Sequence, residues 1–200
     1  MNAKLNRLMK NERGITALET AIILIAFVVV AAIFAFTVLS TGTFLTERSK
    51  EAAYAGLQEV RGSMELKGSV VAHSDLTNVD YVALTLATVA GGSSVDLGTA
   101  SPKVKISYRD STTNKDLTPT AGATGAADQW VVNDCTGCGG ADGSWILTPG
   151  ALARIYAYVP TGAALIINDT FAIEIKPPTG GTMLIERTLP AKLDTFTDLH

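Results

Sequence analysis

One unbroken apolar stretch near the N-terminus most constrains what this chain can fold into. From Gly14 to Leu45 it reads GITALETAIILIAFVVVAAIFAFTVLSTGTFL, with no charged side chain between Glu19 and Glu47. Between Ala21 and Leu39 only Thr37 is polar. About 20 helical residues, rising ~1.5 Å each, cross the ~30 Å hydrocarbon layer of a bilayer. The stretch is therefore long enough to span a membrane as a helix.

Basic side chains precede this stretch and set its expected orientation. They are Lys4, Arg7, Lys10 and Arg13, opposed by Glu12 alone. The positive-inside rule then keeps the N-terminus in the cytoplasm and exports the remainder. A secretory signal peptide has a similar basic start, but its apolar core is only ~7–15 residues long and ends at a small-residue cleavage site. The run is too long for that class, and a permanent single-span anchor fits its length.

The junction Arg13-Gly14-Ile15, followed by Glu19, resembles a class III, or type IV pilin-like, signal. In such signals a prepilin-type peptidase of the membrane cuts after the glycine and leaves the apolar helix on the mature protein. The resemblance implies a cleaved leader over residues 1–14 and a mature chain that starts at Ile15. Such a subunit is inserted transiently in the membrane and is then withdrawn into a polymer by a membrane assembly platform.

The sequence after Ile15, above all the run IAFVVVAAIFAF, is similar to the N-terminus of archaellins, the subunits of the archaeal flagellum or archaellum. The similarity to archaellins returns in LTPGALARIYAYVP and FAIEIKPPTGGTMLIERTLP. Residues 78–143 show no resemblance that we recognise. Ala17 departs from the family, in which glycine is frequent at the third mature position. The resemblance implies a structural subunit of a helical filament of identical copies, located outside the cell and used for swimming. The alternatives are an adhesive type IV pilus subunit and a membrane-anchored extracellular binding module that never polymerises.

The helix is expected to continue beyond the apolar stretch. From Thr46 to Lys67 apolar residues recur at helical spacing among charged ones, and Gly68 stands where a C-terminal cap is common. We therefore predict one helix over residues 15–67, about 80 Å long. Its apolar part would pack against the helices of neighbouring copies, and its last turns would dock on the β domain of the same chain. The apolar positions of this second part are Ala53, Leu57, Val60 and Met64.

From residue 68 to 200 the pattern changes to an alternation of period two. Val104, Ile106 and Tyr108 alternate with charged residues, for example. Several short strands divided by Gly- and Pro-rich turns indicate a β-sandwich or barrel, and the archaellin resemblance implies an immunoglobulin-like antiparallel β-sandwich, so the fold class is α+β. The polar residues 110–128 are predicted to form a surface loop. The expected strands are 69–73, 79–89, 103–109, 129–132, 151–159, 171–176 and 182–189.

Charge and motifs argue against nucleic-acid binding and catalysis. Loss of residues 1–14 would remove four of the 16 Lys+Arg and one of the 19 Asp+Glu, leaving a net charge of −6. A nucleic-acid partner would call for a basic face instead. His73 and His200 are the only histidines, and no nucleophile elbow, phosphate loop or His-Glu-x-x-His motif occurs. We expect no enzyme activity, no cofactor and no metal.

Four residues remain as candidate sites besides the cleavage junction. Cys135 and Cys138 are too few ligands for zinc, so a disulfide is expected in an exported domain, with free thiols as the alternative in an anaerobic habitat. Asn168 heads the sole N-x-[ST] sequon, and archaellins are commonly N-glycosylated, although such triplets often stay unused. Glu19 could remain at the membrane interface. The resemblance implies instead that it pairs with the new N-terminal amine of a neighbouring subunit during assembly.

Overall fold

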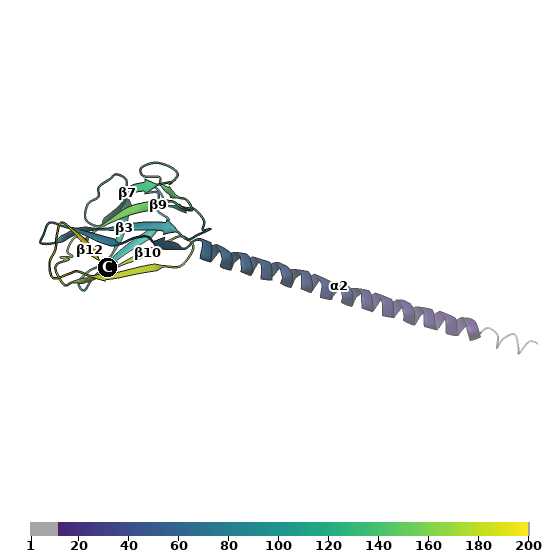
Figure 1. The fold of residues 1–200 in the computed structure, drawn as a ribbon. Helices are drawn as coiled ribbons and strands as arrows, with labels where there is room; N and C mark the ends of the chain where they lie inside the picture. Colours follow the sequence, from purple (N-terminus) through teal and green to yellow (C-terminus); the bar gives the residue numbers. More distant parts are fainter. Residues whose placement is uncertain (1–11, 200) are drawn as a thin grey trace, which may run out of the picture. The chain divides into compact units, whose positions relative to one another are not determined.

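The computed structural model describes residues 12–199, which belong to two compact units, Met1–Tyr54 and Ala55–His200. Helix α2 (Glu12–Arg61) makes up the described part of the first unit and continues into the second, whose remainder is a β domain (Figure 1). Residues 1–11 of the expected leader (residues 1–14) lie outside the described part of the chain. Backbone positions 12–14 already belong to the helix.

Helix α2 contains no proline that would interrupt it, and its threonine hydroxyl groups bond to its own backbone. Thr37 Oγ1 donates to the carbonyl of Ile33 at 2.8 Å, and Thr41 Oγ1 donates to that of Thr37 at 2.9 Å. Such i−4 hydrogen bonds satisfy a polar side chain in apolar surroundings. The threonine hydroxyl groups therefore keep a hydrogen-bond partner even when the helix lies in apolar surroundings.

The helix ends at Arg61, six residues before the predicted end at Lys67. Met64–Leu66 instead form strand β1, which pairs with strand β3 (Val79–Thr88). The helical spacing was misleading because Met64 is buried as part of a strand. The predicted docking of the apolar side chains of the last turns on the β domain is also wrong, because Leu57 and Val60 are 51% and 65% exposed.

The β domain contains twelve described strands. Nine of them form one hydrogen-bonded path in the order β11-β10-β5-β6-β7-β9-β3-β2-β12. Strand β1 is off this path and pairs with β3, while β4 and β8 pair separately. The remaining strands are β2 (Val70–Ser74), β4 (Val95–Asp96), β5 (Lys105–Arg109), β6 (Asn114–Thr120), β7 (Gln129–Thr136), β8 (Ile146–Leu147), β9 (Leu152–Tyr158), β10 (Thr170–Lys176), β11 (Met183–Thr188) and β12 (Phe196–Leu199).

Strand β6 divides this path into two sheets. Its first half pairs antiparallel with β5, and Thr118–Thr120 pair parallel with β7. The β5 sheet therefore holds β11, β10, β5 and the start of β6, and the β3 sheet holds β7, β9, β3, β2, β12 and β1. Side chains from both sheets form one core cluster, as in a β-sandwich. Its members include Ile106, Tyr108, Phe171 and Ile173 from the β5 sheet, and Val82, Leu84, Leu86 and Ile155 from the β3 sheet.

The structure confirms a helix followed by a mostly antiparallel β domain and corrects two details. All seven predicted strands are present, but the β6–β7 pair is parallel because β6 passes from one sheet to the other. The predicted loop over residues 110–128 is wrong in its centre, which is strand β6. Its sequence NKDLTPT lacks alternation because only Leu117 is buried, so backbone pairing rather than side-chain burial defines this strand.

The last helical turn is fixed to the β domain by two turns, and we call this contact the helix joint. The carbonyl of Arg61 accepts the N–H of Ser93 at 2.7 Å, and Arg61 Nε donates to the carbonyl of Gly91 at 3.1 Å. Ser63 Oγ accepts the N–H of Gly181 at 3.2 Å. Gly62 lies against the β10–β11 turn with no room for a Cβ. The joint therefore depends on close backbone approach.

Candidate assembly surface

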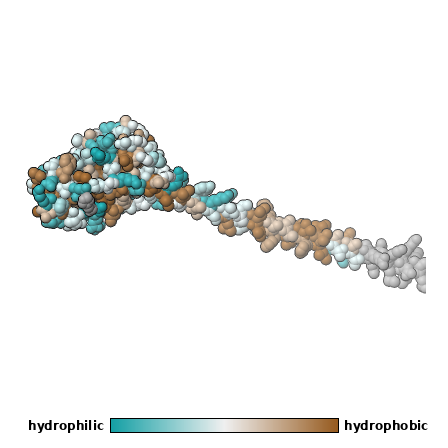
Figure 2. All heavy atoms as spheres, in the orientation of Figure 1, coloured by the Kyte–Doolittle hydropathy of each residue, from teal (hydrophilic) through white to brown (hydrophobic). Residues whose placement is uncertain are grey.

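The apolar stretch of α2 is the largest candidate binding surface. Every residue from Ile15 to Leu45 is exposed in the single chain, and this segment belongs to the one described helix that is long and apolar enough to cross a membrane, Ile15–Arg61. Figure 2 shows the middle of this stretch in brown, with paler residues on either side, and we call the stretch from Ile15 to Leu45 the apolar band. Soluble monomers rarely expose contiguous apolar patches above a few hundred Å². Lipid or other protein chains must therefore cover this band.

Glu19 is the only charged side chain within this band. Among residues 12–199, no hydrogen bond or ion pair involves its carboxylate. It lies one helical turn after Ile15, so the two side chains share a face of the helix. A carboxylate in this position is expensive to bury unless a cation accompanies it. Ile15 is exposed beside it, at the junction where the leader is expected to end.

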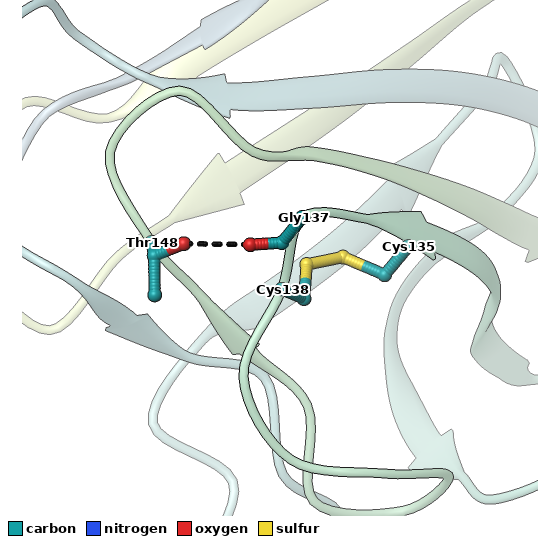
Figure 3. Close-up of a disulfide and its surroundings, with 4 residues drawn as sticks. All are labelled: Cys135, Gly137, Cys138 and Thr148. Atoms are coloured by element: carbon teal, nitrogen blue, oxygen red, sulfur yellow. Dashed lines mark hydrogen bonds between the residues drawn. A yellow bond between two sulfur atoms is a disulfide. The ribbon is translucent and has the colours of Figure 1, made fainter.

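The two cysteines lie at the end of β7, with Cys135 in the strand and Cys138 just after it. Cys135 and Cys138 form a disulfide in the structure, with their Cα atoms 5.6 Å apart (Figure 3). Gly137 between them has φ of 79°, and its carbonyl accepts a hydrogen bond from Thr148 Oγ1 at 2.8 Å. This bond ties the cysteine turn to the segment just after β8. The arrangement is that of a structural clip at the end of a strand.

The sequon lies in the turn before β10. Asn168 is exposed and has φ of 63°, a left-handed conformation that asparagine tolerates better than most residues. Asp169 Oδ2 accepts the N–H of Ile166 at 3.0 Å, so a hydrogen bond within the turn holds its shape. The Asn168 side chain is thereby available on the surface of the β domain.

The described residues can also be compared with the requirements of a metal site and of a ligand pocket. Among residues 12–199 no group of three or more His, Cys, Asp or Glu is placed to hold a metal ion. A shallow hollow of about 640 Å³ lies on the outer face of the β5 sheet, between Arg109, Glu174 and Leu184. Its lining contains neither histidine nor cysteine.

Comparison with known proteins identifies the family. The model of archaeal-type flagellin matches residues 14–187. The chain belongs to the archaeal-type flagellins. Probable flagellin 1 of Archaeoglobus fulgidus is 37% identical over 95% of this chain and 96% of that protein. Probable flagellin 1 of Aeropyrum pernix is 31% identical over 94% of this chain and 97% of that protein.

Solved structures of this archaellin family share the fold. The archaeal flagellum of Methanospirillum hungatei strain JF1 matches with a TM-score of 0.63 and 27% identity, over 91% of this chain and 97% of that chain. Flagellin FlaB1 from Methanocaldococcus jannaschii shares the fold with a TM-score of 0.53 and 20% identity, over 68% and 95%.

Family membership confirms the predicted role of this archaellin as a filament subunit for motility. The filament is a helical homo-oligomer and forms an appendage of the cell surface. The match to archaeal-type flagellins and to an archaeal flagellum favours the archaellum over the adhesive pilus and the binding module. The helix joint is a structural feature that the sequence did not reveal. Its only sequence signal is the pair of segments Arg61-Gly62-Ser63 and Thr179-Gly180-Gly181, which are far apart in the chain.

Proposed function

We propose that the mature archaellin begins at Ile15 and builds the filament core by packing α2 against the same helix of neighbouring copies. The observation that carries this proposal is the complete exposure of the band from Ile15 to Leu45. A prepilin-type peptidase would cut between Gly14 and Ile15, and a membrane assembly platform would then withdraw the helix from lipid. The β domains would form the outer wall.

Apolar burial alone does not drive this transfer, because lipid covers the band as well as protein does. The carboxylate of Glu19, near the edge of the band, is the group for which lipid and a helical core differ. Glu19 needs a cationic partner in a dry helical core, and cleavage creates an α-amine on Ile15. In our proposal the amine of one copy pairs with Glu19 of a neighbour. Cleavage would thus supply the charge that assembly requires, and an uncut chain would stay in the membrane.

Two covalent features would complete the exported β domain. Asn168 is the proposed site of an N-linked glycan, supported by its exposure and by its place in a turn. The Cys135–Cys138 disulfide is proposed to persist outside the cell, where oxidising conditions favour such bonds.

N-terminal sequencing of sheared filaments tests the processing step. We expect the filament protein to start at Ile15, whereas filaments that retain Met1 would contradict the proposal. A Gly14→Val variant should accumulate uncut in the membrane fraction and form no filaments. Glu19→Gln should be cut normally but assemble poorly, because its amide cannot neutralise the amine. The control Glu47→Gln removes the same charge beyond the apolar band and should assemble like the wild type.

A further inference from the structure

The β domain carries different charges at its two ends. Its joint end is the end at the helix joint, where Val89 N–H donates to the carbonyl of Ser63 just after β3 finishes. Its far end is the β2–β3 turn of residues 75–78, at the opposite end of β3. The ten residues of β3 separate the two ends by ~33 Å at ~3.3 Å per residue.

Two lysines face each other at the joint end of the β5 sheet. Lys105 of β5 and Lys176 of β10 are direct cross-strand partners, and both are exposed. Like charges opposite each other destabilise a sheet. Neither lysine forms an ion pair with any residue from 12 to 199. The isolated domain therefore contains two adjacent lysines without an ion pair, which an anionic partner would stabilise.

The far end carries a carboxylate on a rigid turn. Asp75 Oδ1 accepts the N–H groups of Thr77 at 2.8 Å and Asn78 at 2.7 Å. Hydrogen bonds from the backbone of Asn78 and Thr77 lower the pKa of Asp75, so the group is ionised at neutral pH. No cationic side chain among residues 12–199 forms an ion pair with it. This turn is therefore a fixed negative charge without a counter-charge.

Leu76, at the same turn, is an unusual residue for its conformation. Its φ is 74°, which costs a residue other than glycine about 1–2 kcal/mol. Its side chain is also 65% exposed, so the strain gains no burial within the chain. The N–H of Leu76 donates to Ser74 Oγ at 3.2 Å, which helps to hold the turn. Residues kept in strained conformations cluster at functional contacts.

We propose that these two ends contact each other between copies: the Asp75–Leu76 turn of one subunit docks on the Lys105–Lys176 pair of the next. The contact rests on the proposed polymerisation and adds a second interface between the outer domains. It joins two different surfaces, so it does not close on itself and continues along a helical filament. Leu184, 63% exposed in the row of side chains next to Lys176, offers Leu76 an apolar contact. Glu174 is the cross-strand partner of Leu184, and it lies farther from the joint end than the two lysines do.

Thermal dissociation of sheared full-chain filaments tests the contact. The measurement is the temperature at which half of the protein no longer sediments, in ~50 mM NaCl and in ~1 M NaCl, where the Debye length is only ~3 Å. Asp75→Asn keeps the oxygen that accepts the turn hydrogen bonds but removes the charge. This variant and the double variant Lys105→Gln/Lys176→Gln should dissociate several degrees earlier at low salt. At high salt both should match the wild type, because the charge contact is then screened.

Matched variants separate this contact from general effects of charge and folding. Asp134→Asn and the double variant Lys115→Gln/Arg154→Gln remove the same charges from other strands, at exposed positions, and should leave the dissociation temperature unchanged. Leu76→Asn relieves the backbone strain, so the detergent-solubilised subunit should be at least as stable while the filament dissociates earlier at both salt concentrations. Asp75→Lys should weaken filaments, and adding Lys105→Glu and Lys176→Glu should restore them.

The contact would be overturned if the charge variants dissociated like the two controls, or if the charge swap failed to restore the stability of the filaments. Either result would leave helix-driven polymerisation intact. A wild-type protein that never sediments as filaments would contradict polymerisation itself, and with it the contact.

Discussion

At the helix joint, Gly62 shows how one absent Cβ fixes a connection. A Cβ at this position would collide with the side chain and backbone of Thr179, and Gly180 packs as closely on Ser63. Gly62→Ala should lower the free energy of unfolding of the β domain by about 1–3 kcal/mol. Near-UV circular dichroism of the detergent-solubilised chain would show this as a lower Tm. The control Gly56→Ala has open space around it and should not lower the Tm; equal values for both variants would contradict this account of the joint.

Tyr108 links a buried ring to the pH dependence of stability. It is buried beside Phe171, and its hydroxyl donates to Asp110 Oδ2 at 3.2 Å. Burial, followed by the charge of Asp110, raises the pKa of Tyr108 well above its usual value. The contribution of the protonated phenol is therefore complete below pH ~10, the pKa in the unfolded chain, and declines as the pH rises further.

A Tyr108→Phe variant separates the hydrogen bond from the titration. Near pH 7 it should be less stable by about 0.5–1.5 kcal/mol, because Asp110 loses a donor. Above pH ~10 its stability should decline less steeply than that of the wild type, since phenylalanine has no proton to lose. Urea unfolding between pH 7 and 11 measures both effects. Parallel curves for the two proteins would show that Tyr108 does not titrate on unfolding.

At the scale of elements, the disulfide acts on the segment that follows β7. Gly139 and Ile146 exchange two backbone hydrogen bonds, at 2.9 and 2.8 Å, within this segment. Closing a loop of about four residues contributes about 2 kcal/mol in the chain-entropy account. A Cys135→Ser/Cys138→Ser variant should still fold, with a slightly lower Tm and faster amide exchange at Gly139 and Ile146. Exchange that rises equally in β3 would instead indicate a global role for the disulfide.

For the whole molecule, core and assembly surface lie in separate parts of the sequence. Every buried hydrophobic residue of the described chain lies at or after Met64, and the apolar band ends at Leu45. A protein that begins at Ala55 should therefore fold and remain a soluble monomer, because the proposed charge contact alone is worth only about 1 kcal/mol. Analytical ultracentrifugation at micromolar concentration measures this. Sedimentable polymer from the shortened protein would show that the β domains assemble without the helix.

The sequence alone determined the apolar helix, the seven main strands and the archaellin family. These features are local: a run without charges must be covered by apolar surroundings, and strands buried on one face alternate with period two. Only the tertiary structure decided that Met64–Leu66 form a strand rather than the last helical turn, because burial against β3 outweighs helical spacing. It also decided that β6 bridges two sheets through backbone hydrogen bonds, which leave no side-chain pattern. The helix joint and the unlike ends of the β domain arise in the same way, from residues far apart in the chain that only the packed fold brings together.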